Sequence, residues 1–152
     1  MKRIYVDEKW CLGCHLCEYY CAFAQTNEKD MARALKDRKI APRIQVEDSG
    51  NVHFAVSCRH CKEPLCVKAC ITGALSVEDS VIRIDPDRCV GCYTCVLICP
   101  YGAIAPAIAG ATAPEGGGLV VQKCELCLQN KMGTPQCVQN CPNAAIVYED
   151  RG

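Results

Sequence analysis

The sequence contains few large apolar side chains. Of its 152 residues, nine are aromatic: one Trp, six Tyr and two Phe. Half of the chain counts as hydrophobic, but 16 of those residues are cysteines. Small domains obtain most of their stability from burying branched and aromatic side chains. We therefore do not expect a conventional apolar core, and we expect another component to fill part of the interior.

The chain also lacks net charge and long apolar runs. Its 17 basic and 17 acidic residues cancel, which argues against nucleic-acid binding because that function requires a basic footprint. No apolar run of signal-peptide length follows Met1. The uncharged tract Cys89–Pro114 is interrupted by Ala, Gly and Pro, so we expect no direct insertion into a membrane. We predict a cytoplasmic protein with reduced thiols, unless a partner carries the chain out of the cell.

Motifs of substrate chemistry are missing as well. The sequence has no Gly-x-Gly-x-x-Gly dinucleotide motif, no phosphate-binding loop and no set of ligands for an open metal site. We therefore expect no catalytic residues, and we expect any substrate chemistry to belong to a partner protein.

Cysteine, in contrast, is abundant. Sixteen cysteines in 152 residues exceed the level of roughly 8–10 % at which a short chain is interpreted as cross-linked by disulfides or metal. They form four groups of four with none left over: Cys11-x2-Cys14-x2-Cys17-x3-Cys21, Cys58-x2-Cys61-x4-Cys66-x3-Cys70, Cys89-x2-Cys92-x2-Cys95-x3-Cys99 and Cys124-x2-Cys127-x9-Cys137-x3-Cys141. Each group ends in the same x3 step, so the chain repeats one ligand motif four times.

The spacing of the third group indicates iron–sulfur chemistry. In Cys-x2-Cys-x2-Cys the chain coils tightly, and three thiolates can point at one cubane. The x3 step continues into a helical turn that carries the fourth thiolate to a second cubane. This run, followed by Pro as in Cys99-Pro100, is the signature of two-cluster bacterial ferredoxins. The first group matches it except for the Pro, and the remaining two have a longer gap before the third cysteine.

Zinc and disulfide bonds account for the cysteines less well. Zinc also uses Cys-x2-Cys pairs, but zinc sites do not need three cysteines within seven residues. A disulfide scaffold is consistent with the cysteine content but not with the repeated spacing. We therefore predict four [4Fe–4S] clusters, and since no group lacks a ligand, we do not expect a [3Fe–4S] site.

The pairing of the groups follows from the segments between them. The second and third groups are 18 residues apart, and residues 74–77 and 81–84 are predicted to form a hairpin with a turn at 78–80. Together these groups predict a compact two-cluster module with outer strands at 53–56 and 103–105. The first and fourth groups then pair through terminal strands 2–6 and 145–148, which brings Cys141 to the first cluster and Cys21 to the fourth. The alternative, first with second and third with fourth, stays open, but it must accommodate 36 residues between Cys21 and Cys58.

The predicted fold class is therefore α+β, with two bacterial-type 2[4Fe–4S] ferredoxin-like modules, one nested inside the other. The outer module comprises residues 1–51 plus 119–152, and the inner module comprises residues 52–118. Three connecting segments are also predicted: a helix over 26–38 capped by Thr26 or Asn27, a hairpin of 42–47 with 51–56, and a flexible loop over 105–118.

Several runs around the cysteines resemble those of a known family. They are Cys58-Arg59-His60-Cys61-Lys62-Glu63-Pro64-Leu65-Cys66, Val90-Gly91-Cys92, Cys99-Pro100-Tyr101-Gly102-Ala103-Ile104 and Lys123-Cys124-Glu125-Leu126-Cys127. They are similar to the four-cluster electron-transfer subunits of anaerobic oxidoreductase complexes, such as formate dehydrogenase, formate hydrogenlyase, carbon monoxide dehydrogenase-linked systems and tungsten aldehyde oxidoreductases. Ala22 and Ile71 replace the family's Pro after the first and second groups. The chain stops eleven residues after Cys141, which favours the short cytoplasmic members.

The resemblance implies a ligand set for each cluster. One cluster is held by Cys11, Cys14, Cys17 and Cys141, a second by Cys58, Cys61, Cys66 and Cys99, a third by Cys89, Cys92, Cys95 and Cys70, and a fourth by Cys124, Cys127, Cys137 and Cys21. It also implies the function: single electrons pass through four [4Fe–4S] clusters between a catalytic oxidoreductase subunit, which contains molybdenum, tungsten, nickel–iron or flavin, and a further donor or acceptor. Alternatives are a free-standing polyferredoxin, a structural zinc protein, and self-association into a filament.

Side chains near the ligands have two interpretations each. The cations Arg59, Lys62, Lys68, Arg88, Lys123 and Lys131 are expected to be solvated, and the alternative is tuning of cluster potentials or docking of a partner. His15 and His60 are expected to be partly exposed spacers, and the alternative is hydrogen bonding to sulfur or proton coupling. We expect Trp10, Tyr20, Tyr93 and Tyr101 to shield the clusters from water.

Overall fold

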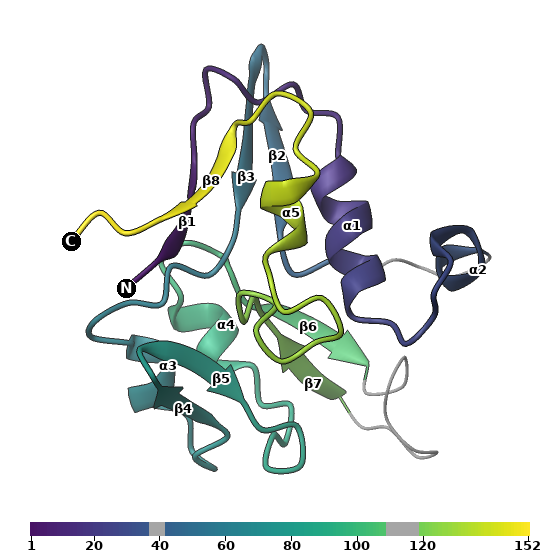
Figure 1. Ribbon diagram of the computed structural model, residues 1–152. Coiled ribbons are helices and arrows are strands. Elements are labelled where there is room, and N and C mark those ends of the chain that lie inside the picture. The colour runs from purple at the N-terminus through teal and green to yellow at the C-terminus, as the bar shows by residue number, and fades with distance from the viewer. Residues whose placement is uncertain (37–41, 109–118) are drawn as a thin grey trace. The chain divides into compact units, whose positions relative to one another are not determined.

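The computed structural model describes residues 1–36, 42–108 and 119–152 (Figure 1). It has a mixed α/β fold of short elements. The chain divides into two compact units: Met1–Ser57 together with Leu126–Gly152, and Cys58–Glu125. Within the described ranges, no helix is long and apolar enough to cross a membrane.

The first unit contains seven of these elements. They are β1 (Arg3–Val6), α1 (Leu16–Ala24), α2 (Met31–Leu35), β2 (Gln45–Ser49), β3 (Val52–Val56), α5 (Gln136–Gln139) and β8 (Ile146–Glu149). The second unit contains six: α3 (Leu65–Ala69), β4 (Leu75–Glu78), β5 (Val81–Ile84), α4 (Thr94–Ile98), β6 (Ala105–Ile108) and β7 (Leu119–Gln122).

Strands from the two ends of the chain pair in the first unit. β1 and β8 are antiparallel, with Arg3 opposite Glu149 and Val6 opposite Ile146 (Figure 1). The Asp7 N–H extends the ladder by donating to the Ala145 oxygen at 2.8 Å. This confirms the predicted pairing of the terminal strands. In the same unit α1 packs against α5, so the helices of the first and fourth cysteine groups are neighbours.

The insert after the first cysteine group folds partly as predicted. The hairpin of β2 with β3 is confirmed, with Gln45 opposite Val56. The predicted helix over 26–38 is wrong at its start, because α2 begins at Met31 and its N-cap is Asp30, whose carboxylate accepts from the Ala32 N–H at 2.9 Å. Thr26 caps the preceding helix instead, donating its hydroxyl to the Phe23 oxygen at 2.8 Å. Residues 37 and 38 lie outside the described residues.

The second unit contains two hairpins. The predicted hairpin is confirmed as β4 with β5, and its turn residues Asp79 and Ser80 have φ of 50° and 65°, as tight hairpin turns require. The flexible loop predicted over 105–118 is wrong at its start, because β6 pairs with β7. Residues 109–118 lie outside the described part of the chain.

The outer strands predicted for the inner module are corrected as well. Residues 53–56 belong to β3, which lies in the first unit and pairs with β2. Residue 105 belongs to β6, which pairs with β7. Each segment pairs with an apolar strand that is close to it in sequence. Such local pairing has a lower loop-closure cost than pairing between distant segments.

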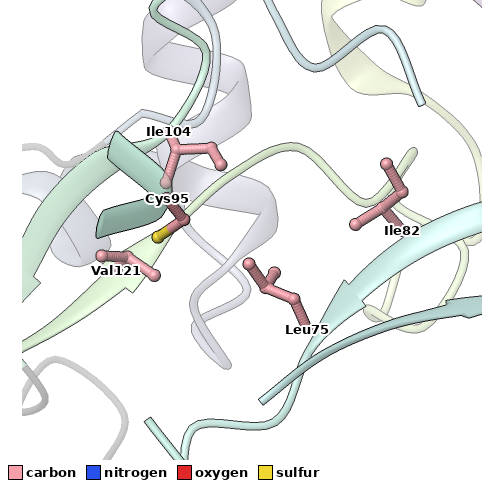
Figure 2. Close-up of a cluster of buried hydrophobic side chains, with 5 residues drawn as sticks. All are labelled: Leu75, Ile82, Cys95, Ile104 and Val121. Carbon is pink, nitrogen blue, oxygen red and sulfur yellow. The ribbon is translucent and has the colours of Figure 1, made fainter. Parts of the chain in front are cut away.

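The core of the second unit is small and rich in cysteine. Its buried members are Leu75, Ile82, Cys95, Ile104 and Val121 (Figure 2). Partly buried side chains pack against it: Cys66, Val67, Cys70, Ile84, Cys89, Tyr93, Val96 and Cys99. Cysteines of the second and third groups therefore share one interior.

Candidate metal centres

Each cysteine group builds a short helix at its x3 step. Cys17 and Cys21 lie on α1. In the later groups the third cysteine lies on α3, α4 or α5, and the fourth follows within two residues of the helix end. The helical turn predicted at the x3 step is therefore confirmed in all four groups.

The loops before these helices contain left-handed residues at matching positions. In the first group Gly13 and His15 have φ of 66° and 62°, and in the third group Gly91 and Tyr93 have φ of 69° and 58°. Such residues let the chain turn so that successive N–H groups face one concave side, which suits an anionic group. The first and third groups thus repeat the same loop conformation.

In the second unit, the last cysteine of the third group lies near the second group. Burial is the main cause that raises the pKa of Cys58, and the charges of Cys61 and Cys99 raise it further. Burial likewise raises the pKa of Cys66, with contributions from Cys58 and Cys99. Cys99, the last cysteine of the third group, therefore lies close enough to the second group for their charges to interact.

The last cysteine of the second group likewise lies near the third group. Burial raises the pKa of Cys95, and the charges of Cys89 and Cys70 add to the effect. The charge of Cys70 also acts on Cys92. Cys70 is the last cysteine of the second group, so it lies close enough to the third group for their charges to interact.

The first unit brings together members of the first and fourth groups. Burial raises the pKa of Cys17 to about 12, and Glu18, Cys14 and Cys11 contribute. Burial also raises the pKa of Cys21, the last member of the first group, and the charge of Cys127 acts on it.

The remaining ligand candidates are placed as follows. Cys137 is buried on α5, and Cys141 is half-buried and accepts from the Ala145 N–H at 3.3 Å. Cys124 is buried at the end of the second unit, whose boundary with the first falls between Glu125 and Leu126.

The donor set fits iron–sulfur clusters. All sixteen cysteines are free thiols, and soft thiolates are the usual ligands of such clusters. Within residues 1–36, 42–108 and 119–152, no three His, Cys, Asp or Glu side chains converge as a single metal ion would require. The chemistry of the sixteen thiols suits iron and sulfide.

Hydrogen bonds to sulfur support the thiolate form. The Arg43 N–H donates to Cys21 Sγ at 3.2 Å. Backbone and hydroxyl groups of Thr94 lower the pKa of Cys92, and the hydroxyl lies 3.5 Å from its sulfur. At Cys70, burial raises the thiol pKa, but hydrogen bonds from the Leu75 backbone and from Thr72 lower the pKa overall. Deprotonated cysteine is the form that binds metal.

Of the six cations near the ligands, five are exposed, as expected: Arg59, Lys62, Lys68, Arg88 and Lys131. Lys123 is different, with only 1 % of its surface exposed. The expectation for His60 is also wrong, because this side chain is 1 % exposed and its Nδ1 accepts from the Ile82 N–H at 3.0 Å. Both side chains contact β5, a contact between distant segments that the motif spacing does not reveal.

The histidine and aromatic neighbours follow the predictions in part. His15 is partly exposed, and its Nδ1 lies 2.8 Å from the Glu18 carboxylate. Trp10 is 58 % exposed, which contradicts its predicted shielding role, whereas Tyr93 packs against the core.

Two glutamates next to ligands were not predicted. The carboxylates of Glu18 and Glu125 accept from the Val46 and Ile84 N–H groups at 2.8 and 2.9 Å. Each glutamate directly follows a cysteine, and this adjacency is the sequence feature that could have identified them.

Comparison with known proteins identifies the family. Two models of a 4Fe–4S binding domain match the chain, one over residues 8–24 and one over residues 81–104. Electron transport protein HydN of Escherichia coli (strain K12) is 34% identical over 155 aligned positions, which cover 97% of this chain and 87% of HydN. An iron-sulfur protein of Rhodospirillum rubrum is 35% identical over 156 positions, covering 97% of this chain and 81% of that protein.

The similarity to HydN extends over nearly the whole of both chains. The cysteine groups are the features that a [4Fe–4S] cluster needs, and two of them lie within the matched domains. The chain therefore belongs to the family of ferredoxin-type 4Fe–4S electron transport proteins represented by HydN, and it binds [4Fe–4S] clusters.

Proposed function

We propose that this chain is the electron-transfer subunit of an anaerobic oxidoreductase complex and carries single electrons through four [4Fe–4S] clusters. The observation that carries the proposal is that the last cysteine of each group in the second unit lies near the other group. Cys99 lies with Cys58 and Cys66, and Cys70 lies with Cys92 and Cys95. This proximity supports an exchange of fourth ligands between two clusters, which is the arrangement expected of two-cluster ferredoxins.

The ligand sets of the four clusters follow the same principle. The proposed sets are Cys11, Cys14, Cys17 with Cys141; Cys58, Cys61, Cys66 with Cys99; Cys89, Cys92, Cys95 with Cys70; and Cys124, Cys127, Cys137 with Cys21. The interactions of Cys17 with Cys11 and Cys14 support the first three members of the first set, and that of Cys21 with Cys127 supports the fourth set.

We also propose that the two modules are nested. The first unit contains both chain ends and the second is continuous, which supports an outer and an inner module. The packing of α1 on α5 and of α3 on α4 supports the pairing of first with fourth groups and second with third.

The chain's own residues would determine how each cluster behaves. When bound, a [4Fe–4S] cluster accepts or releases one electron with little structural change. The N–H groups of Arg43 and Ala145 lie at 3.2 and 3.3 Å from ligand sulfur atoms and would stabilise negative charge there. Cys14 and Cys92 are exposed, so the clusters they would hold are the best placed within their units to exchange electrons with a partner.

The relatives support a redox partner. HydN is an electron transport protein, and the Rhodospirillum rubrum relative is an iron-sulfur protein. We therefore propose a cytoplasmic complex in which a molybdenum, tungsten, nickel–iron or flavin subunit supplies the catalysis and a further protein donates or accepts electrons. Sixteen free thiols suit a reducing compartment.

Anaerobic affinity purification of the tagged chain from its own host tests the proposal. We expect the iron and acid-labile sulfide of four cubanes, together with a partner that contains tungsten, molybdenum, nickel or flavin. Recovery of the chain alone with that iron would favour the free-standing polyferredoxin. Zinc in place of iron would overturn the proposal. Assembly of the purified chain into filaments at high concentration would identify a second copy as a partner.

A further inference from the structure

Three side chains bind the edge of β5 that faces away from β4. The Ile82 N–H donates to His60 Nδ1 at 3.0 Å, and the Ile82 oxygen accepts from Lys123 Nζ. Two residues on, the Ile84 N–H donates to the Glu125 carboxylate at 2.9 Å. All three side chains belong to residues directly adjacent to cysteines. The hairpin is therefore bound to the second and fourth cysteine groups by side chains rather than by another strand.

Lys123 is the charged member of this set that is most deeply buried. It is 1 % exposed, and its ammonium also donates to the Cys124 oxygen at 2.9 Å. Lysine is almost never fully buried unless it is paired. Burial lowers its pKa, whereas the negative groups around it, which are Cys58, Glu125, Cys124 and Cys66, favour its charged form.

The position of the ammonium relative to Cys58 and Cys66 is the important feature. The ammonium bonds to Ile82, which belongs to the buried core against which Cys66 and Cys99 pack. Its positive charge acts on the sulfur atoms of Cys58 and Cys66 and favours negative charge there. The two carbonyl oxygens of Ile82 and Cys124 fix its place, and β5 belongs to a paired hairpin. A fixed charge in a buried site acts more strongly than the same charge in water.

We propose that Lys123 sets the reduction potential of the cluster held by Cys58, Cys61, Cys66 and Cys99, by stabilising its reduced form. This inference rests on the proposed function, since it requires a cluster at these four cysteines. Reduction adds one negative charge to the cluster, and charge is one of the levers by which a protein tunes cluster potentials. The buried ammonium favours the added electron, so its presence raises the potential.

Glu125 acts on the cluster potential in the opposite direction. Its carboxylate interacts with the ammonium and is held by the Ile84 N–H. It offsets part of the positive charge of Lys123. Removing the charge of Glu125 while keeping its acceptor oxygen should therefore raise the cluster potential. Removing the charge of Lys123 should lower it.

The test is a potentiometric titration of the full chain, purified anaerobically and followed by electron paramagnetic resonance. The variant Lys123→Gln removes the charge and keeps a hydrogen-bond donor. We expect one reduction step to move to lower potential. At a fixed potential, the ratio of oxidised to reduced cluster should rise at least tenfold, which corresponds to ~59 mV for one electron. Lys62→Gln is the matched control: Lys62 lies between Cys61 and Cys66 but is exposed, and screening by water should keep its shift well below tenfold.

Two further variants separate charge from structure. Lys123→Arg keeps the charge and should leave the step near its original potential, and Glu125→Gln should move it upward. If Lys123→Gln fails to bind iron, the reduction potential of Glu125→Gln is the deciding measurement. An upward shift in that variant would support the proposal, and an unchanged potential would overturn it. Iron-loaded Lys123→Gln that titrates like the unaltered chain would also overturn it. Loss of iron–sulfur signal from the unaltered chain would instead contradict the proposed function.

Discussion

The backbone of Leu119 occupies the space in which a side chain on Gly91 would begin. A Cβ at Gly91 would lie 2.9 Å from the Leu119 carbonyl carbon and closer still to its oxygen, which is nearer than real Cβ atoms approach. Gly91 also has a φ of 69°. The first strand residue of β7 therefore packs directly on the loop between Cys89 and Cys92.

Gly91→Ala is expected to destabilise the fold by about 2–5 kcal/mol, because the left-handed backbone costs about 1–2 kcal/mol and overpacking adds about 1–3 kcal/mol. Anaerobic thermal unfolding and iron content measure the effect. Gly73→Ala is the control, since Gly73 has a φ of 67° and nothing within 4 Å of the added Cβ, so only the backbone cost applies. Equal losses in the two variants would show that Leu119 does not constrain this loop.

The loss of stability in Gly13→Ala should be partly reversed by a second substitution, unlike the loss in Gly91→Ala. The added Cβ at Gly13 would lie 2.7 Å from His53 Nδ1, which is a side-chain atom. Truncating that side chain in Gly13→Ala/His53→Ala removes the clash and should restore part of the unfolding free energy and the iron content lost in Gly13→Ala. A double-mutant cycle checks this coupling. Additive losses would contradict the contact.

The stability contributed by His15 should depend on pH. The hydrogen bond with Glu18 is the largest cause that raises its pKa, and the charges of Glu18 and Asp48 add to it. A raised folded pKa means that folding favours the protonated ring, so the contribution is fully present below the unfolded pKa of about 6.5 and is lost as pH rises through the folded pKa. We expect His15→Gln to lower the Tm more at pH 6 than at pH 9. Lys62→Gln, which alters an exposed residue, should show no such difference, and a constant effect of His15→Gln at both pH values would refute the prediction.

The core of the second unit should be sensitive despite its small size. Leu75 is 4 % exposed and belongs to the buried cluster of Figure 2, whereas Leu97 in the same unit is 86 % exposed. Leu75→Ala is expected to cost about 2–5 kcal/mol of unfolding free energy, and Leu97→Ala should stay within about 0.5 kcal/mol of zero. Chemical denaturation of the iron-loaded chain under anaerobic conditions compares them. Similar costs for both would indicate that the cysteines and their clusters, rather than the apolar side chains, provide the stability.

Much of the fold was predictable because its elements are local or lie at matching positions. The turn of Asp79 and Ser80 lies between two apolar runs, and the segments around Ile4 and Ile146 flank the first and last groups symmetrically. The start of α2 was missed because Thr26 and Asp30 are both good capping residues, and only the structure shows that Thr26 completes the end of α1. The strand at 105–108 was missed because Pro106 argues against a strand, although an edge position tolerates it.

The site was predictable where the spacing itself carries the chemistry. The x3 step predicts the helical turn, which the structure contains in all four groups. The burial of Lys123 and His60 could not be predicted, because it depends on β5, and Ile82 lies 41 and 22 residues from them. A lysine beside a cysteine has the same sequence pattern whether it faces water or a peptide oxygen.

The proposed exchange of fourth cysteines gives the last prediction. The charge of Cys99 acts on Cys58 and Cys66, whereas Cys95, four residues before it, interacts with Cys89 and Cys70. Cys99→Ala and Cys66→Ala should therefore alter the same reduction step, because each would leave one cluster with three thiolates. Cys95→Ala should alter a different step.

Potentiometric titration followed by electron paramagnetic resonance, with iron counted per chain, compares the three variants. Cys70→Ala provides the reciprocal control, since Cys70 lies with Cys92 and Cys95 and should affect the same step as Cys95→Ala. If Cys99→Ala instead altered the same step as Cys95→Ala, each group would hold its own cluster. The packing of α3 with α4 would then be a feature of the fold without a role in ligation.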